Sequence, residues 1–347
     1  AAELARSKVS LSFASIRDLS ADLASQFAMH EQYLCFPGLT AISEEAALAI
    51  AAHSGPLAFD GMTYLPGPVA RALSGLKHSL SFWGLTELTD EAARELGKHS
   101  DDLFLDAVTE LSAAAASGLA THDGALYLRG LKTLSRAAAK AMAPHDGSLW
   151  LGGLEELPDE TMRELAKHTG GLVLDGLTSL SDSALQSLSQ FRGWSLSLDG
   201  LTTLPAKAAA LLARHKAAGL YIGGLRLRGL TSISPEAAEG LTRFKGRLYL
   251  DGLEAISDDV AIRLAAHKGL LSMRGLTTLS DRAARLLGTK PEIEVEDSKW
   301  PESAAACFRE SRECTAAHRD NKGPRLVKPL LDDGGSIQAD ETSLKST

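Results

Sequence analysis

Hydrophobic residues recur along the chain at fixed positions of a repeating unit, and a Gly-Leu pair recurs with them. We take the glycine of each pair, or the residue that replaces it, as the reference position of its repeat. The first eight reference positions are 23 residues apart, and the later gaps are 24, 29, 23 and 23 residues. The positions are Ser15, Gly38, Gly61, Gly84, Ala107, Gly130, Gly153, Gly176, Gly200, Gly229, Gly252 and Gly275. This regularity indicates a repeat protein.

Each repeat begins with a predicted strand. Apolar residues stand four and two residues before the reference position, as Leu172 and Leu174 do, and Leu248 and Leu250 show the same spacing. Alternation with a period of two over a short stretch predicts a β-strand with one buried face.

A short helix is predicted in the second half of each repeat. Ser, Thr or Pro stands five residues after the reference position, and an acid often follows, as in Ser257-Asp258. A hydroxyl group there can cap free N–H groups, and the acid faces the positive end of the helix dipole. Ala261 and Leu264 then lie three residues apart on one helical face. The spacing leaves room for about two helical turns.

One strand and one short helix cannot bury their apolar faces alone, but stacked copies can. Stacking pairs each strand with the next in parallel, about 4.8 Å away. The sequence therefore predicts an α/β solenoid of about 12 repeats, with a parallel inner sheet and short outer helices.

The repeats resemble the leucine-rich repeat family, and most closely its cysteine-containing subclass. Motifs such as LVLDGLTSLSD at 172–182 and RLAAH at 263–267 carry the resemblance. Leu177 and Leu253 stand where the family has Cys or Asn, and Asn321 is the sole asparagine, so another group must replace the family's asparagine ladder. The resemblance implies a leucine-rich-repeat-type solenoid, a bacterial source for such short Ala-rich repeats, and protein binding as the usual function.

The repeat register also predicts how the chain is organised. Residues 1–300 form the solenoid, and Ala1 and Leu4 fall on helical positions, as expected of an array truncated within a repeat. Pro301 begins a predicted capping helix over 301–320. Residues 321–347 are rich in Gly, Pro and charge and are predicted to form a disordered tail.

The 29-residue gap contains extra residues around 219–228. A 23-residue coil has no room for them, so we expect the strand ladder to be perturbed here. The sequence LRLR favours an additional short strand that points Arg226 and Arg228 outward.

Composition and charge narrow the possible functions. The net charge is −8 and the pI about 5.7, which argues against a general nucleic-acid binder. No apolar run approaches the ~20 residues that span a bilayer. No Walker loop, HExxH, GxSxG or CxxC motif is present. We therefore expect no enzyme activity, catalytic residue or cofactor, and the composition leaves the cellular compartment open.

Histidines recur at one repeat position, fifteen residues after the reference position. We interpret them as a structural column at the solvent edge of the core, where imidazole donates to the last helical carbonyl groups. Zinc binding and pH sensing are the alternatives, and zinc is disfavoured because its ligands converge on one point. The members are His30, His53, His99, His122, His145, His168, His215 and His267.

Residues three and one before the reference position point away from the core and vary from repeat to repeat, as a binding surface would. Bulky aromatic and charged residues gather on consecutive repeats and form the predicted binding site: Trp83, Phe104, Asp106, Tyr127, Arg129 and Trp150. A secondary candidate patch consists of Arg226, Arg228, Tyr249, Asp251 and Arg274. The alternative is that the aromatic residues only support one another across the ladder.

These observations favour a non-enzymatic scaffold that binds a protein or peptide on its inner sheet. A carbohydrate-binding or enzyme-associated module is an alternative, because exposed aromatic rings also stack on sugars. A purely structural array is the other alternative.

Overall fold

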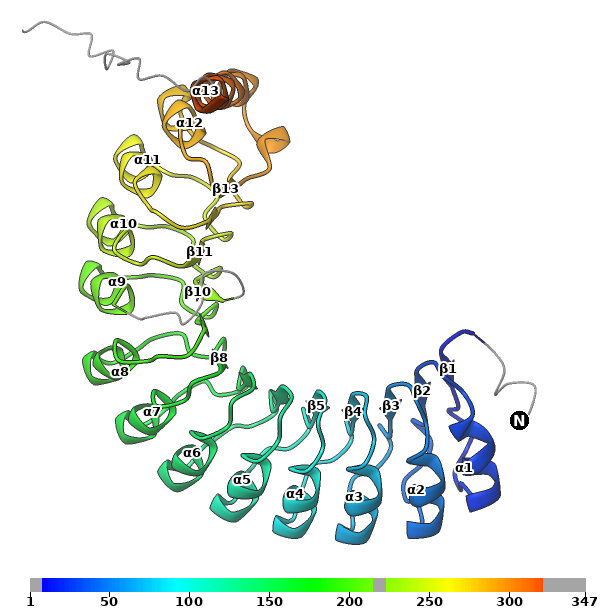
Figure 1. The fold of residues 1–347 in the computed structure, drawn as a ribbon. Helices are drawn as coiled ribbons and strands as arrows, with labels where there is room; N and C mark the ends of the chain where they lie inside the picture. The colour runs from blue at the N-terminus through cyan, green and yellow to red at the C-terminus, as the bar shows by residue number, and fades with distance from the viewer. Residues whose placement is uncertain (1–7, 215–222, 321–347) are drawn as a thin grey trace, which may run out of the picture.

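In the computed structural model, which describes residues 8–214 and 223–320, thirteen strands form one parallel sheet in strict sequence order. The sheet lines the inner side of an arc and the helices lie outside it (Figure 1). The strands are β1 Leu11–Ser12, β2 Leu34–Cys35, β3 Leu57–Ala58, β4 Leu80–Ser81, β5 Leu103–Phe104, β6 Leu126–Tyr127, β7 Leu149–Trp150, β8 Gly171–Val173, β9 Ser195–Ser197, β10 Gly224–Arg226, β11 Arg247–Tyr249, β12 Leu271–Ser272 and β13 Ile293–Glu294. The predicted α/β solenoid is confirmed.

The helices of the repeats are short, as predicted. They are α1 Ala21–Ala28, α2 Glu44–Ile50, α3 Gly67–Leu73, α4 Asp90–Leu96, α5 Ala113–Leu119, α6 Arg136–Met142, α7 Asp159–Leu165, α8 Asp182–Leu188, α9 Ala206–Leu212, α10 Pro235–Leu241, α11 Asp258–Ala265 and α12 Asp281–Gly288. A 3-10 turn at Asp297–Lys299 precedes the longer α13, Glu302–Asp320.

Hydroxyl groups begin most of these helices. Ser112, for example, caps α5 by accepting a hydrogen bond from the backbone N–H of Ala115 at 2.9 Å. The same hydroxyl donates to the carboxylate of Asp90, at the start of α4, at 2.5 Å. Ser112 therefore satisfies its own helix and joins it to the preceding helix, and Ser181 and Ser280 do the same through Asp159 and Asp258.

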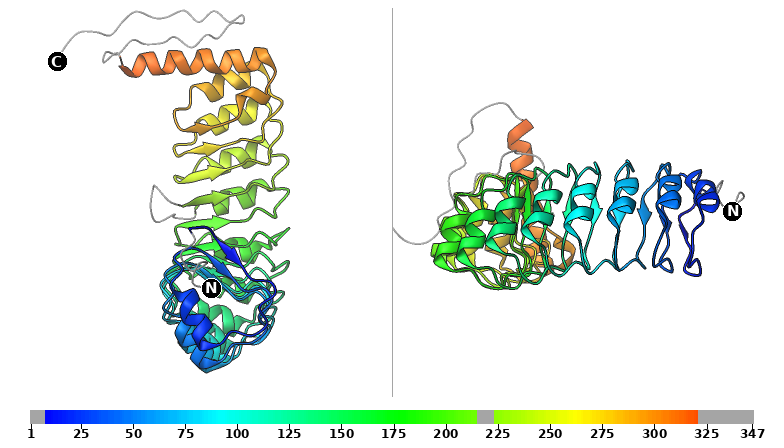
Figure 2. Two further views of the ribbon diagram at one scale, coloured as in Figure 1. Left: turned by 90° about the vertical axis from the view of Figure 1, so that its right-hand side faces the viewer. Right: turned by 90° about the horizontal axis from the view of Figure 1, so that it is seen from below.

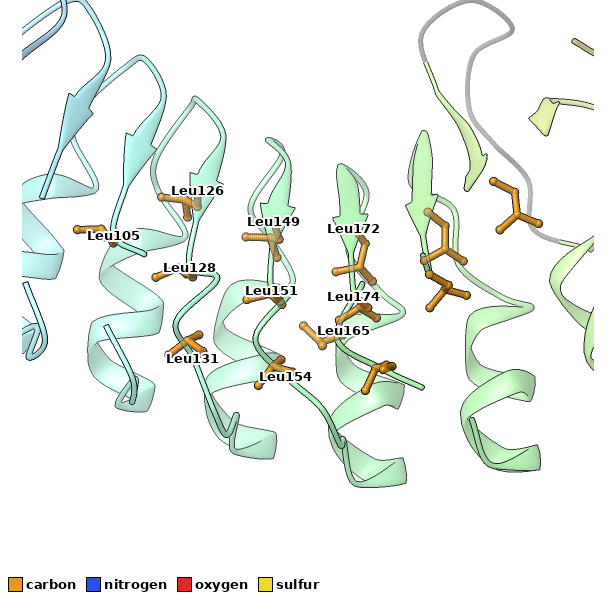
Figure 3. Packing of buried hydrophobic residues seen from close by; sticks show 14 of the residues in the cluster. Leu105, Leu126, Leu128, Leu131, Leu149, Leu151, Leu154, Leu165, Leu172 and Leu174 are labelled. Atoms are coloured by element: carbon orange, nitrogen blue, oxygen red, sulfur yellow. The ribbon is translucent and has the colours of Figure 1, made fainter. Parts of the chain in front are cut away.

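Leucines at equivalent positions form continuous rows through the core (Figure 3). Leu103, Leu126 and Leu149 are register partners on β5, β6 and β7 and are fully buried. Leu128 and Leu151 belong to the next row, below the strands. Each fully buried leucine contributes about 2 kcal/mol of apolar burial, so the repeated rows hold the repeats together.

The strand ladder runs without interruption past the 29-residue gap. Leu225 on β10 pairs with Leu196 on β9 and with Leu248 on β11. The prediction of an added strand or bulge is wrong for the described residues, because β10 itself is the next strand of the ladder. The extra residues fall between Leu212 and Gly224, and residues 215–222 lie outside the described part of the chain.

At the C-terminal end, α13 packs against α12 and crosses the end of the array (Figure 2). The indole Nε1 of Trp300 donates to the backbone carbonyl of Leu276 at 2.9 Å. The Trp300 ring also meets Phe308 of α13 edge-on, with the centroids 5.1 Å apart. These contacts cover the last leucine row. The predicted tail, 321–347, lies outside the described residues.

Within the described residues, none of the helices combines the length and the apolar character that crossing a membrane requires.

Candidate functional site

Three aromatic side chains stack on one another on the concave face of β5, β6 and β7. Phe104, Tyr127 and Trp150 are register partners on these strands. The ring centroids of Phe104 and Tyr127 are 4.2 Å apart with 13° between the planes, and those of Tyr127 and Trp150 are 5.1 Å apart with 20°. We call these three residues the aromatic ladder.

Parallel stacking decides which part of each ring a partner can reach. Both faces of Tyr127 are covered by rings, so Tyr127 presents only its edge and its hydroxyl group. Open faces remain at the two ends of the ladder. Phe104 adjoins the small side chain of Ser81, and Trp150 adjoins Val173.

A charged pair lies along one side of the aromatic ladder. The guanidinium of Arg129 donates to both carboxylate oxygens of Asp106, from Nε at 3.0 Å and from a terminal nitrogen at 2.6 Å. The same guanidinium lies 5.5 Å from the centroid of the Tyr127 ring. The hydrogen bonds that Arg129 donates to Asp106 raise the pKa of Arg129, and burial raises the pKa of Tyr127. Both groups therefore keep their charge states over the physiological range.

The structure brings together five of the six residues predicted for the primary site. Trp83 follows β4, is 58% exposed, and occupies the repeat position that Asp106 holds in the next repeat. In the described part of the chain its ring stacks on none of the ladder rings, because Ser81 and not Trp83 is the register partner of Phe104.

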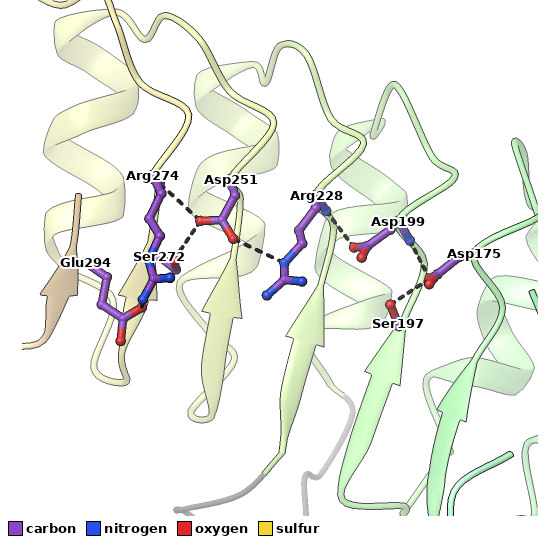
Figure 4. Close-up of polar contacts among 8 residues, drawn as sticks. All are labelled: Asp175, Ser197, Asp199, Arg228, Asp251, Ser272, Arg274 and Glu294. Carbon is purple, nitrogen blue, oxygen red and sulfur yellow. Dashed lines mark hydrogen bonds and ion pairs between the residues drawn. The ribbon is translucent and has the colours of Figure 1, made fainter. Parts of the chain in front are cut away.

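Aspartates one residue before the reference position connect the repeats on the concave face (Figure 4). Asp175 accepts from the backbone N–H of Asp199 at 3.0 Å, and Asp199 accepts from that of Arg228 at 2.8 Å. Asp175 also accepts from the hydroxyl of Ser197 at 2.6 Å. This aspartate column accepts hydrogen bonds from backbone N–H groups and so replaces the asparagine ladder of the leucine-rich repeat family. This role was not predicted, although Asp recurs at this position.

The secondary candidate patch is a network of ion pairs (Figure 4). Arg228 pairs with Asp251 at 3.1 Å, and Arg274 pairs with Glu294 at 2.6 Å. Arg226 and Arg228 lie 5.6 and 5.1 Å from the centroid of the Tyr249 ring. Arg228, Asp251 and Arg274 of this patch therefore have ion-pair partners, of which Glu294 lies outside the predicted patch.

The histidine column is buried, so the prediction of a solvent-edge position is wrong. Its seven described members are 0–3% exposed, and His215 lies outside the described residues. Adjacent rings stack nearly parallel, as in His99 and His122, with centroids 5.7 Å apart and 11° between the planes. His122 Nδ1 donates to the backbone carbonyl of His99 at 2.8 Å, and His168 Nε2 donates to that of Gly147 at 3.0 Å. The acceptors thus belong to the loop after the preceding helix.

Burial disfavours the charged form of these imidazole groups. It lowers the pKa of His145 to about 4, with help from the neighbouring His168 and His122. Burial and then the charge of Lys290 lower the pKa of His267 to about 4. Histidine, Cys, Asp and Glu side chains do not gather in groups of three that could hold a metal ion within 8–214 and 223–320.

The column position also accepts other buried side chains. Phe191 and Phe244 take the place of histidine in two repeats, and Phe244 stacks on His267 with centroids 6.5 Å apart. In the last repeat Lys290 takes the place, 3% exposed, and donates from Nζ to the carbonyl of His267 at 2.6 Å. Leu76 fills the position in a further repeat, so buried side chains of several shapes fill the space between the loops.

A recess on the convex side was not predicted. It lies between α7 and α8, has a volume of about 500 Å³ and is lined by Arg163, Lys167, Gln186 and Arg192, among others. Lys167 pairs with the buried Glu164, which ties one of these charges to the fold.

Known proteins resemble this chain in structure and not in sequence. No family model and no curated protein matches the sequence. A leucine-rich repeat protein of Leptospira interrogans, LIC12759, aligns with a TM-score of 0.39 and 18% identity over 85% of this chain and 86% of its own. A chain of the Toll–Spatzle complex of Drosophila aligns with a TM-score of 0.49 and 16% identity over 78% of this chain and 40% of its own. The repeated strand–helix coil and its single parallel sheet give this chain the fold of a leucine-rich-repeat solenoid.

Proposed function

We propose that this chain is a non-enzymatic scaffold that binds a protein or peptide on its concave face, through the aromatic ladder and the Asp106–Arg129 pair. The observation that carries the proposal is the row of stacked, half-buried rings on consecutive strands. Stacking fixes these side chains before binding, so less conformational entropy is lost when a partner arrives. Rigid aromatic groups beside an Arg have the composition of a binding hot spot.

The same stacking argues against carbohydrate binding as the main function. A sugar ring packs on the open face of an aromatic ring, but both faces of Tyr127 are covered by its neighbours, and Phe104 and Trp150 each keep only one open face. A protein segment can instead pack across the ring edges and the Tyr127 hydroxyl. The net charge of −8 disfavours nucleic acid as the partner.

Selection from a displayed library of random dodecapeptides tests the proposal. Peptides are selected on the wild-type protein alone, and the Tyr127→Ala/Trp150→Ala variant is kept for the titrations. Synthetic copies are then titrated calorimetrically. We expect the double variant to bind at least about 30-fold more weakly, as loss of hot-spot residues would cause.

Tyr64→Ala is the matched control, because Tyr64 is 56% exposed but lies on a loop after β3. Its affinity for the peptides should equal that of the wild type. If all selected peptides depend on Tyr249 and not on Tyr127 and Trp150, the secondary patch is the binding site. Binding of oligosaccharides in place of peptides would contradict the proposal.

A further inference from the structure

The aromatic ladder ends at Trp150, and the next repeat leaves the outer face of this indole uncovered. Tyr127 stacks on one face, with the ring centroids 5.1 Å apart. The register partner on the other side is Val173, which is 7% exposed. Because the valine side chain is much shorter than an indole, it can cover only the base of that face. Trp150 thus offers the larger of the two aromatic faces that the ladder leaves open, the other being that of Phe104.

Beside Trp150 the concave surface has a gap at Gly152. Among the described repeats, this is the sole glycine one residue before the reference position, where other repeats carry residues such as Arg129 and Asp175. A methyl group added at Gly152 would meet nothing within 4 Å. The backbone therefore does not require glycine here, and the missing side chain leaves open space between Arg129 and Asp175.

The two acids that follow this gap are held by hydrogen bonds, and the charges of Arg226 and Arg228 act on Asp199 without forming a salt bridge with it in the described part of the chain. Asp175 Oδ1 accepts from the Ser197 hydroxyl and from the N–H of Asp199, and Asp199 Oδ1 accepts from the N–H of Arg228. Neither carboxylate forms an ion pair with any described residue, and the guanidinium of Arg228 pairs with Asp251 instead. Burial, with the charge of Asp175, raises the pKa of Asp199.

We propose that the free face of Trp150, the gap at Gly152 and the carboxylate of Asp175 form a subsite for one basic side chain, Arg or Lys, of the bound segment. The proposal rests on the proposed function and specifies the partner of that same surface. A cation over an indole face is attracted by the ring quadrupole. The carboxylates of Asp175 and Asp199 supply the complementary charge that the fold leaves unpaired.

The test uses the selected dodecapeptides whose binding depends on Tyr127 and Trp150 of the aromatic ladder. Each Arg of a peptide is replaced by citrulline, which is similar in shape but uncharged, and each Lys by norleucine. Titrations compare the wild type with Asp175→Asn/Asp199→Asn and with Gly152→Gln. Asparagine Oδ1 can accept the same hydrogen bonds, so the double variant loses charge while the aspartate column is kept.

We expect one basic residue in each peptide whose replacement weakens binding about threefold to tenfold. The Asp175→Asn/Asp199→Asn variant should show a similar loss for the original peptide and none for the replaced peptide. Gly152→Gln should weaken the original peptide as well, because its side chain fills the gap. Glu155→Gln/Glu156→Gln is the matched control, because it removes two exposed charges after β7 and should leave affinity within about twofold.

Three outcomes would overturn the inference. If the peptides require the aromatic ladder but no basic residue, the inferred subsite is wrong and the proposed function is unaffected. An equal loss in the Glu155→Gln/Glu156→Gln control would show general attraction to an acidic protein. If no peptide binds through the ladder, the proposed function fails and the subsite fails with it.

Discussion

Two neighbouring glycines, Gly152 and Gly153, differ sharply in the space around their Cα atoms. A methyl group at Gly153 would lie 2.0 Å from the carbonyl oxygen of Arg129 in the preceding repeat, whereas one at Gly152 would touch nothing. Glycine at position 153 therefore allows the close approach of adjacent repeats, although Ala107 holds the equivalent position in another repeat. Gly152 instead leaves concave space open.

This contrast gives a matched pair of variants. Gly153→Ala should lower the free energy of unfolding by about 1–3 kcal/mol, since the added methyl group must push adjacent repeats apart. Gly152→Ala should change it by less than about 0.5 kcal/mol. Chemical denaturation monitored by circular dichroism measures both, and equal losses would contradict the assignment.

The aspartate column can be tested at Asp251, which accepts from the Ser272 hydroxyl at 2.6 Å and from the Arg274 N–H at 3.1 Å. Asp251→Ala leaves both donors and the Arg228 guanidinium without this partner, and should cost about 1–3 kcal/mol. Asp251→Asn keeps an acceptor oxygen and should cost less than half as much. Thermal unfolding of the two variants decides, and similar losses would show that charge outweighs the hydrogen bonds.

At the scale of the element, strands and helices follow from local spacing. Leu172 and Leu174 are the alternating buried residues of a strand, and Ser257 caps the start of α11. Both features lie where the sequence predicts them. The histidine column was misplaced because burial depends on how closely adjacent loops pack, which repeat spacing does not show. The aspartate column was missed because its acceptors bond backbone N–H groups of the next repeat.

The candidate site was predictable to a similar degree. The repeat register alone puts Phe104, Tyr127 and Trp150 on one face of consecutive strands. Which faces of these rings stay open depends on ring orientation, and the sequence carries no signal for that. The repeat register places Asp106 and Arg129 close together, and the structure shows that the two form a bidentate ion pair.

Burial of the histidine column makes the stability of the fold depend on pH. The pKa of His145 is about 4 in the folded chain against 6.5 for an ordinary histidine, so the unfolded chain binds protons first as pH falls. Its contribution to stability is complete above pH ~6.5 and is lost as pH falls toward ~4, at up to about 1.4 kcal/mol per pH unit for each such histidine.

His145→Phe isolates this effect, because Phe191 and Phe244 show that the column accepts phenylalanine. The variant should lose less stability than the wild type between pH 6.5 and 4.5. Denaturation midpoints measured at several pH values make the comparison, and subtracting the two curves removes the shared titration of carboxylates. Parallel curves would mean that His145 does not resist protonation in the fold.

At the scale of the whole molecule, curvature follows from the sizes of the two layers. Parallel strands are about 4.8 Å apart, whereas a helix with its side chains is about 10 Å wide. The helical side of each repeat therefore takes more room than the strand side, and the array bends with its sheet inside (Figure 1). Repeats contact mainly their neighbours, so damage at one end should stay local.

Trp300→Ala tests this locality. Its loss removes the hydrogen bond to Leu276 and the contact with Phe308, and exposes the last leucine row. Hydrogen exchange measured by mass spectrometry should speed up across α12 and α13 while α5 to α7 keep wild-type protection. Uniform acceleration along the chain would show that the array unfolds as one unit.

The spacing of the rings in the aromatic ladder should also make the intrinsic fluorescence and circular dichroism of the protein sensitive to the curvature of the solenoid. Excitation absorbed by Tyr127 passes efficiently to an indole whose centre lies 5.1 Å away, so Tyr127 should emit almost no light of its own while the two strands stay in register. The coupled transitions of three parallel rings should also give a strong near-ultraviolet circular dichroism band. Any partner that flattens or tightens the arc would change the ring spacing, and the protein would report that change in its spectrum without an added label.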